Sequence, residues 1–161
     1  IAADHGLVQV LHPHVDSLVE QAAELERVLA GTTTMFCLDT GHLAIGGADP
    51  VDVARRHAAR VGLVHLKDVR LTVAERLVDH ELTLMQAVQA GVFSPLGQGD
   101  VPIDKVILTL EDAGYTGWYV LEQDVALTEG ESTDPGPITD VRASLAFLHD
   151  LAGRVDGTTP A

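Results

Sequence analysis

The chain has 161 residues, of which 46% are hydrophobic, so it is long and apolar enough to bury a core. Its 24 acidic and 10 basic residues give a formal charge of −14, which disfavours nucleic acid and anionic membranes as partners, because both are bound chiefly through Lys and Arg. The single cysteine excludes an intrachain disulfide, and no apolar run is long enough to span a bilayer. We expect a cytoplasmic protein.

The first predicted elements are a strand and a helix. Residues 6–11 form a strand-like run that begins close to Ile1, so the start of the chain resembles a cut rather than a natural terminus. Ser17 and Glu20 have the Ser-x-x-Glu spacing of a helix cap, and apolar positions then recur every three or four residues until Gly31. The pattern predicts a helix that begins after Ser17 and ends near Gly31.

The same order of strand and helix returns three more times. Short apolar runs occupy residues 35–38, 61–66 and 118–121, and the predicted helices occupy residues 51–60, 71–90 and 103–113. Asp49 and Pro50 begin the first of these helices with a capping carboxylate and a first-turn proline. The chain therefore contains four strand–helix units.

The C-terminal part is predicted as a loop, a helix and a tail. Residues 129–137 are rich in Glu, Gly, Pro, Ser and Thr, which is typical of a loop, and a last helix follows at about 139–151. We predict one domain over residues 1–152 and a flexible tail over residues 153–161.

Apolar runs alternating with amphipathic helices indicate parallel strands joined by crossover helices. Four units are half the number in a (β/α)8 barrel, and 161 residues fall well short of the roughly 250 of a complete one. We expect four further units N-terminal to Ile1. Because a half-barrel leaves two edge strands open, we also expect self-association.

Residues able to bind a metal lie at the end of each apolar run. They are His12 and His14, Asp39 and His42, His65 and Lys67, and Glu122 and Asp124. In a parallel barrel the C-terminal ends of all strands lie on one face, so these side chains should gather there. Mixed carboxylate and imidazole ligands suit a divalent metal, for which we favour Mn²⁺ or Co²⁺ over Mg²⁺ or Zn²⁺.

Each candidate also has a purely structural interpretation. Asp39 could cap the turn that follows it, and His65 could be a hydrogen-bonded core histidine. Glu122 could form a simple ion pair with Lys67. His42 could be a ligand, a substrate contact or a turn residue, of which we favour a role behind the ligands or against substrate.

Several motifs in order make the chain similar to a known family. They are Leu38-Asp39-Thr40-Gly41-His42-Leu43, Val64-His65-Leu66-Lys67-Asp68, Pro95-Leu96-Gly97-Gln98-Gly99, and Gly114-Tyr115-Thr116-Gly117-Trp118 with Leu121-Glu122-Gln123-Asp124. Over about residues 7–150 the chain resembles the sugar phosphate isomerase/epimerase superfamily of xylose isomerase-like TIM barrels, and within it the inosose dehydratases. The resemblance implies an α/β fold, the C-terminal half of a (β/α)8 barrel with the N-terminal half absent.

The resemblance also implies a metal site. The metal ligands of the superfamily's last strands carry over to Asp39, His65 and Glu122, and His12 stands where most members have a glutamate. His12 is therefore the expected fourth ligand. His14, Asp68 and Arg70 are expected to contact substrate.

The implied reaction is the metal-dependent dehydration of a cyclic keto-polyol, a small polyhydroxylated carbonyl substrate. Glu122 or a metal-bound water is the expected base, and Lys67 or His42 would protonate the leaving oxygen or stabilise the enolate. The alternatives are a sugar isomerase or epimerase that acts through an enediolate at the same metal, and an inactive truncated half-barrel.

Overall fold

The computed structural model describes residues 2–127 and 137–155, and a parallel β-sheet lies at its centre. The strands are β1 (Val10–Leu11), β2 (Met35–Asp39), β3 (Val61–Leu66) and β6 (Tyr119–Leu121), in the order β1-β2-β3-β6. Every neighbouring pair in this sheet is parallel. The four predicted parallel strands are thus confirmed, although β1 is shorter than the expected run 6–11.

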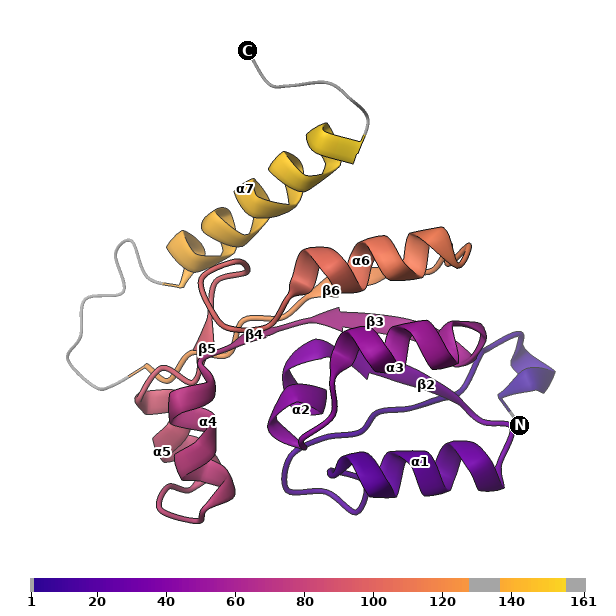
Figure 1. Ribbon diagram of the computed structural model, residues 1–161, viewed down its shortest axis with the longest axis horizontal. Helices are drawn as coiled ribbons and strands as arrows, with labels where there is room; N and C mark the ends of the chain where they lie inside the picture. Colours follow the sequence, from indigo (N-terminus) through magenta and orange to yellow (C-terminus); the bar gives the residue numbers. More distant parts are fainter. Residues whose placement is uncertain (1, 128–136, 156–161) are drawn as a thin grey trace.

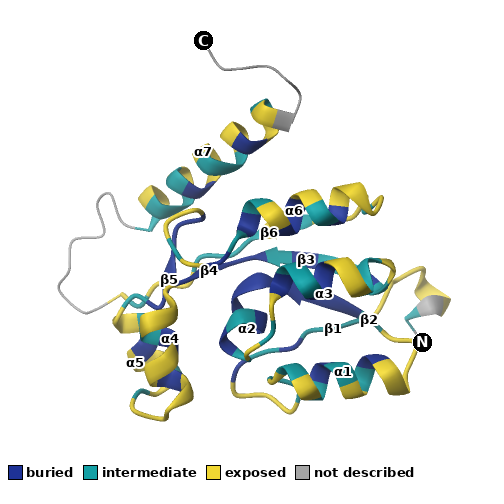
Figure 2. Cartoon of the chain, viewed as in Figure 1, coloured by how far each residue is buried: buried dark blue, intermediate teal, exposed yellow. Residues whose placement is uncertain are grey.

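Helices cover one face of the sheet (Figure 1). They are α1 (Ala22–Gly31), α3 (Pro50–His57) and α6 (Ile103–Asp112), and a short 3-10 turn (Ala58–Arg60) continues α3. The inward sides of these helices and the central strands are buried, whereas the outward sides of the helices are exposed (Figure 2). Phe36 and Leu38 of β2 and Val64 of β3 belong to the hydrophobic cluster. Burial of this cluster stabilises the layered arrangement.

Helix α1 begins four residues after the expected position. The Glu24 carboxylate accepts hydrogen bonds from the amides of Glu20 and Gln21, both at 2.9 Å, so the cap forms at Gln21. Ser17 instead bonds Val19 within the preceding loop. The Ser-x-x-Glu spacing is therefore present, but a later glutamate caps the helix.

Two short helices replace the single helix expected over residues 71–90. They are α4 (Leu71–Val78) and α5 (Leu84–Gln89), and the chain turns between them at His80, whose φ is 59°. Thr83 then caps α5 by accepting a hydrogen bond from the Gln86 amide. The apolar periodicity continues through both helices, so the sequence pattern does not reveal the break between them.

Four small elements were not predicted. Helix α2 (Thr40–Ile45) follows β2 without a loop, and strands β4 (Asp68–Val69) and β5 (Phe93–Ser94) form a separate antiparallel pair. A 3-10 turn (Ala3–His5) precedes β1. Helix α2 and the β4–β5 pair lie beside the C-terminal ends of β2 and β3, where they border the site described below (Figure 1).

The last described helix, α7 (Ile138–Val155), is longer at both ends than the expected 139–151. Residues 156–161 of the expected tail, and 129–136 of the expected loop, lie outside the described residues, so the domain boundary stays a prediction. Within ranges 2–127 and 137–155, no helix combines the length and apolar composition needed to cross a membrane.

Candidate metal centre

The ends of the four parallel strands bring His12, Asp39, His65 and Glu122 together. Asp39 of β2 is directly opposite His65 of β3 in the strand register. The Glu122 amide donates to the Leu66 carbonyl at 3.1 Å, which extends the β3–β6 pairing by one residue. The expected convergence of these residues therefore follows from the register of a parallel sheet.

Asp39 uses its two carboxylate oxygens differently. Oδ1 accepts hydrogen bonds from the amides of Gly41 and His42, both at 2.9 Å, and so caps helix α2. Oδ2 lies 3.3 Å from Nε2 of His12 and 3.5 Å from Nδ1 of His65. One fully buried side chain therefore caps α2 with one oxygen and leaves the other beside two imidazole rings.

The carboxylate of Asp39 is ionised. Burial by itself would raise its pKa, but His12 and His65 stabilise the anion and hold the pKa well below its usual range. The Asp39 carboxylate in turn raises the pKa of His65, against the opposing effect of burial. An anionic oxygen therefore faces two imidazole rings.

Nδ1 of His65 is a buried nitrogen without a hydrogen-bond partner among the residues that the structure describes. It lies 3.0 Å from Oε1 of Glu122 and 3.5 Å from Oδ2 of Asp39, without the alignment of a hydrogen bond. Ligand atoms of these three residues lie within 4.8 Å of one another. An unpaired imidazole nitrogen beside two carboxylates fits a divalent cation, and His12 lies close enough to be the fourth ligand.

Lys67 places a positive charge at the edge of this cluster. Its Nζ lies 2.8 Å from Glu122 Oε2 and 2.8 Å from Asp124 Oδ2, and it sits over the Phe93 ring at 4.9 Å from the centroid. Burial lowers the pKa of Lys67, but Asp39 and Asp124 outweigh this and raise it. Lys67 is thus a buried, charged ammonium group. Asp124 was among the strand-end residues expected to gather here, whereas Phe93 was not predicted.

His42 is buried and neutral. Burial lowers its pKa to about 3. Its Nε2 lies 3.2 Å from Lys67 Nζ, and because an ammonium group only donates, this nitrogen accepts the hydrogen bond. The ring packs against that of His14 at an interplanar angle of 37°, with centroids 3.7 Å apart, and His14 Nδ1 lies 2.7 Å from the Val15 carbonyl. His42 therefore holds Lys67 and His14 in place.

The structure gives Asp68 a role different from the expected substrate contact. One carboxylate oxygen accepts from the amides of Val69 and Val101, and the other accepts from those of Gly97 and Gly99, at distances of 2.9–3.1 Å. The side chain is buried and both oxygens are already used by the backbone. Asp68 therefore fixes the loop over residues 97–101.

Arg70 also differs from the expectation. It is exposed, and its Nη1 donates to the Gly91 carbonyl at 2.8 Å, where it ties the start of α4 to the turn after α5. Side chains alternate between the two faces of a strand. However, β3 ends at Leu66, and the chain leaves the parallel sheet before Asp68. Strand-end placement therefore applies to His65 and Lys67 but not to Asp68 or Arg70.

Cys37 lies on the same face of β2 as Asp39, close to His12 and His65. Burial raises the pKa of its thiol to about 12, with a further contribution from the carboxylates of Asp39 and Glu122. The alternation along the strand places it toward the site, but no metal role was predicted for it.

Comparison with known proteins agrees with this architecture. The family model described as xylose isomerase-like TIM barrel matches residues 1–151. An inosose dehydratase of Bacillus cereus (strain AH820) is 36% identical over 158 residues, which cover 95% of this chain and 51% of the relative. The chain thus spans about half the length of the curated relatives it matches.

Solved structures show the same fold. The probable 3-DHS dehydratase AsbF of Bacillus anthracis, involved in petrobactin synthesis, superimposes with a TM-score of 0.62 at 18% identity, covering 90% of this chain and 51% of that one. The IOLI protein, whose structure has a bound zinc atom, gives a TM-score of 0.62 at 14% identity, covering 95% of this chain and 51% of that one. The described strands form half of such a barrel. This chain belongs to the xylose isomerase-like TIM barrel family.

Proposed function

We propose that the chain carries the metal-binding half of an active site that dehydrates a small cyclic keto-polyol of the inosose class. The single observation that carries the proposal is the buried, unpaired Nδ1 of His65 between the carboxylates of Asp39 and Glu122. The 36% identity to an inosose dehydratase supports the reaction class. Because the chain spans about half of such relatives, the activity of the whole protein is part of the proposal.

His12, Asp39, His65 and Glu122 would hold a divalent metal, which we propose to be Mn²⁺ or Co²⁺. The two carboxylates favour these ions over softer ones, and the zinc in the IOLI structure supports a divalent ion in this fold. When bound, the ion supplies Lewis acidity that makes the proton next to the substrate ketone easier to remove. Removal of the ion should therefore abolish turnover.

The protein's own residues manage the protons. Glu122 takes the proton from the carbon next to the ketone, and Lys67 donates a proton to the departing hydroxyl group, which leaves as water. The 2.8 Å contact between Glu122 Oε2 and Lys67 Nζ then allows the proton to return to Lys67, which completes the cycle. His42 has a pKa of about 3 and is neutral near pH 7, so it positions Lys67 instead of donating a proton itself.

A neighbouring cavity of about 500 Å³ would accept the substrate ring. Its lining includes His14, His42, Phe93 and Asp124, so polar groups at one side adjoin an apolar wall. Hydroxyl groups of a polyol would form hydrogen bonds with the polar groups, and the C–H face of its ring would pack on the apolar wall. Among the expected substrate residues, His14 is the one that this cavity favours.

Isomerisation or epimerisation is the second candidate. The same Lys67–Glu122 contact would let the proton return to the carbon beside the ketone or to its neighbour, instead of allowing hydroxide to leave. The two reactions differ in their products and not in the residues that the site supplies.

The deciding experiment is incubation of the chain with scyllo-inosose and Mn²⁺ while the ultraviolet absorbance of an unsaturated dione is followed. Dehydration produces this absorbance, and the Glu122→Gln variant should lack it. The Arg76→Gln variant is a matched control, because Arg76 is exposed and pairs with Glu81 on a helix outside the site. Turnover of a ketose without dione formation would favour the isomerase, and no turnover of either substrate would favour an inactive half-barrel.

We also propose that the chain self-associates. Strands β1 and β6 are the edges of the four-stranded sheet, and unpaired edges readily pair with another chain. Sedimentation at several concentrations measures this, and a monomer at all of them would contradict the proposal.

A further inference from the structure

Cys37 is the only cysteine in the sequence, and the proposed reaction gives it no role. Its side chain is completely buried. Because side chains alternate along a strand, Cys37 and Asp39 share one face of β2, whereas Phe36 and Leu38 pack with the hydrophobic cluster on the other. The thiol therefore lies on the metal-facing side of the sheet.

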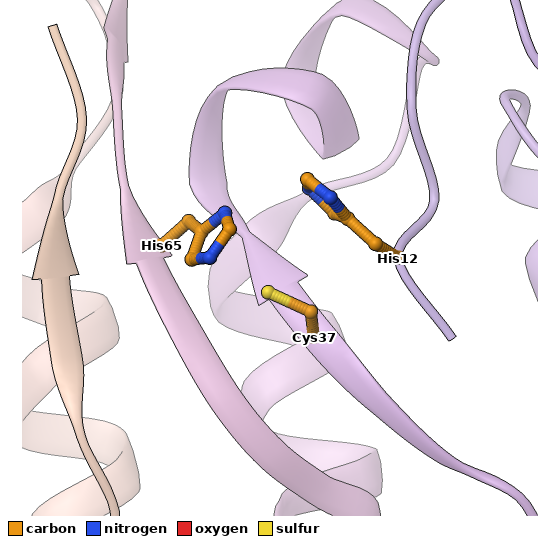
Figure 3. A group of neighbouring side chains, drawn as sticks. All are labelled: His12, Cys37 and His65. Carbon is orange, nitrogen blue, oxygen red and sulfur yellow. The ribbon is translucent and has the colours of Figure 1, made fainter. Parts of the chain in front are cut away.

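The thiol has two imidazole neighbours. Figure 3 shows the sulfur of Cys37 directed into the space between His12 and His65, whose rings come from different segments. Ligand atoms of the three residues lie within 4.8 Å of one another, and the centroids of the two rings are 4.7 Å apart. Ligand atoms about 2.0–2.3 Å from a tetrahedral ion are about 3.3–3.8 Å from one another. Small side-chain rotations would therefore bring the three onto one ion.

We propose that His12, Cys37 and His65 form a second donor set, which binds a thiophilic divalent ion such as Zn²⁺ or Cd²⁺ through the Cys37 thiolate. The Cys37 proton passes to solvent as the sulfur–metal bond forms. Thiolate selects soft and borderline ions, whereas carboxylates favour harder ones. The choice of ion therefore decides which donor set is used.

The two sets share His12 and His65, so one ion excludes the other. The set with Asp39 and Glu122 lies at the strand ends, and the set with Cys37 lies deeper by two residues along β2. A thiophilic ion held by the deeper set would occupy His12 and His65. It would not face the substrate as an ion at the strand ends does. Such ions should compete with Mn²⁺ and inhibit the proposed enzyme. The inference rests on the metal-binding part of the proposed function and is independent of its substrate.

The test uses the full chain, freed of metal by a chelator and titrated without oxygen with CdCl₂ and separately with MnCl₂. The wild-type protein should develop thiolate-to-metal charge-transfer absorption with Cd²⁺ that saturates at one equivalent. Since the sequence has one cysteine, this absorption reports on Cys37 alone. The Cys37→Ser variant should lack it and bind Cd²⁺ at least about tenfold more weakly, with Mn²⁺ affinity changed by less than about twofold.

Glu122→Gln is the matched variant for the other donor set. It should bind Mn²⁺ at least about tenfold more weakly and retain the charge-transfer absorption with Cd²⁺. Because the absorption is measured in the wild-type chain, the test does not depend on the folding of any variant.

Two results would overturn the inference. Binding of Cd²⁺ by the wild-type chain without thiolate absorption would remove Cys37 from the ligands and leave the metal site of the proposed function intact. Absence of binding of both Cd²⁺ and Mn²⁺ would defeat both the inference and that metal site.

Discussion

Nδ1 of His65 lies 3.0 Å from Oε1 of Glu122, although the two residues come from neighbouring parallel strands that are far apart in the sequence. Oδ2 of Asp39 lies 3.5 Å from the same nitrogen. A cation among these atoms could be bound by all three groups, since their ligand atoms lie within 4.8 Å of one another.

Two substitutions at Asp39 should separate its capping role from its metal-facing role. Asparagine retains an oxygen that can cap α2, whereas alanine does not, so Asp39→Ala should lose about 1–2 kcal/mol more stability than Asp39→Asn. Both should weaken Mn²⁺ binding by about tenfold or more because the anionic oxygen is lost. Urea unfolding and calorimetric titration measure the two effects. Equal stability of the variants would show that the cap contributes nothing.

Asp68→Ala should destabilise the chain by about 3 kcal/mol, because several backbone amides of the loop lose a buried acceptor. Ser94→Ala is the control, since its buried hydroxyl has no partner among the described residues and its removal should change stability by about 0.5 kcal/mol or less. Chemical denaturation gives both values. A loss of substrate affinity without loss of stability in Asp68→Ala would restore the role expected from the sequence.

Acidification should destabilise the metal-free chain through His42. Its pKa of about 3 in the folded state lies below the ordinary value of 6.5, so between these pH values the unfolded chain binds a proton that the folded chain does not. Stability therefore falls as the pH decreases through this window. Between pH 7 and pH 4.5 the wild type should lose about 2 kcal/mol more than His42→Gln.

The depressed pKa of Asp39 acts in a lower window, from its ordinary value of 3.8 downward, so a measurement at pH 4.5 largely isolates His42. The raised pKa of His65 has the opposite sign: its contribution is complete below pH 6.5 and is lost as the pH rises through its folded-state value, equally in wild type and variant. His149→Gln, at an exposed position on α7, should behave as the wild type. Parallel pH profiles for the wild type and His42→Gln would contradict the prediction.

Gly41→Ala should displace Lys67. A Cβ atom at Gly41 would lie 2.8 Å from Cγ of Lys67, so the lysine must move away from Glu122 and Asp124. Misplacement by about 1 Å is expected to reduce turnover by about 100-fold. Gly31→Ala is the matched control, because a Cβ atom there meets nothing within 4 Å and should leave turnover unchanged. Steady-state assays check both, and full activity of Gly41→Ala would show that the position of Lys67 is not critical.

The sequence by itself determined the parallel strands and the gathering of His12, Asp39, His65 and Glu122. Both follow from local rules: apolar runs mark buried strands, and residues at the ends of parallel strands meet on one face. Lys67 could be placed in the site for the same reason. These features depend on the order of residues along each strand, which a single sequence contains.

Only the tertiary structure decided what each side chain does with its polar atoms. Asp68 was expected to contact substrate, but the chain leaves the sheet after Leu66, and the amide of Val69 together with three amides from distant positions takes up the carboxylate. Asp39 has two oxygens with different partners, and His42 is neutral because packing removes it from water. The break between α4 and α5 depends on a turn that helical periodicity does not reveal. Burial and hydrogen-bond partners arise from segments brought together by folding, so a pattern along one segment cannot specify them.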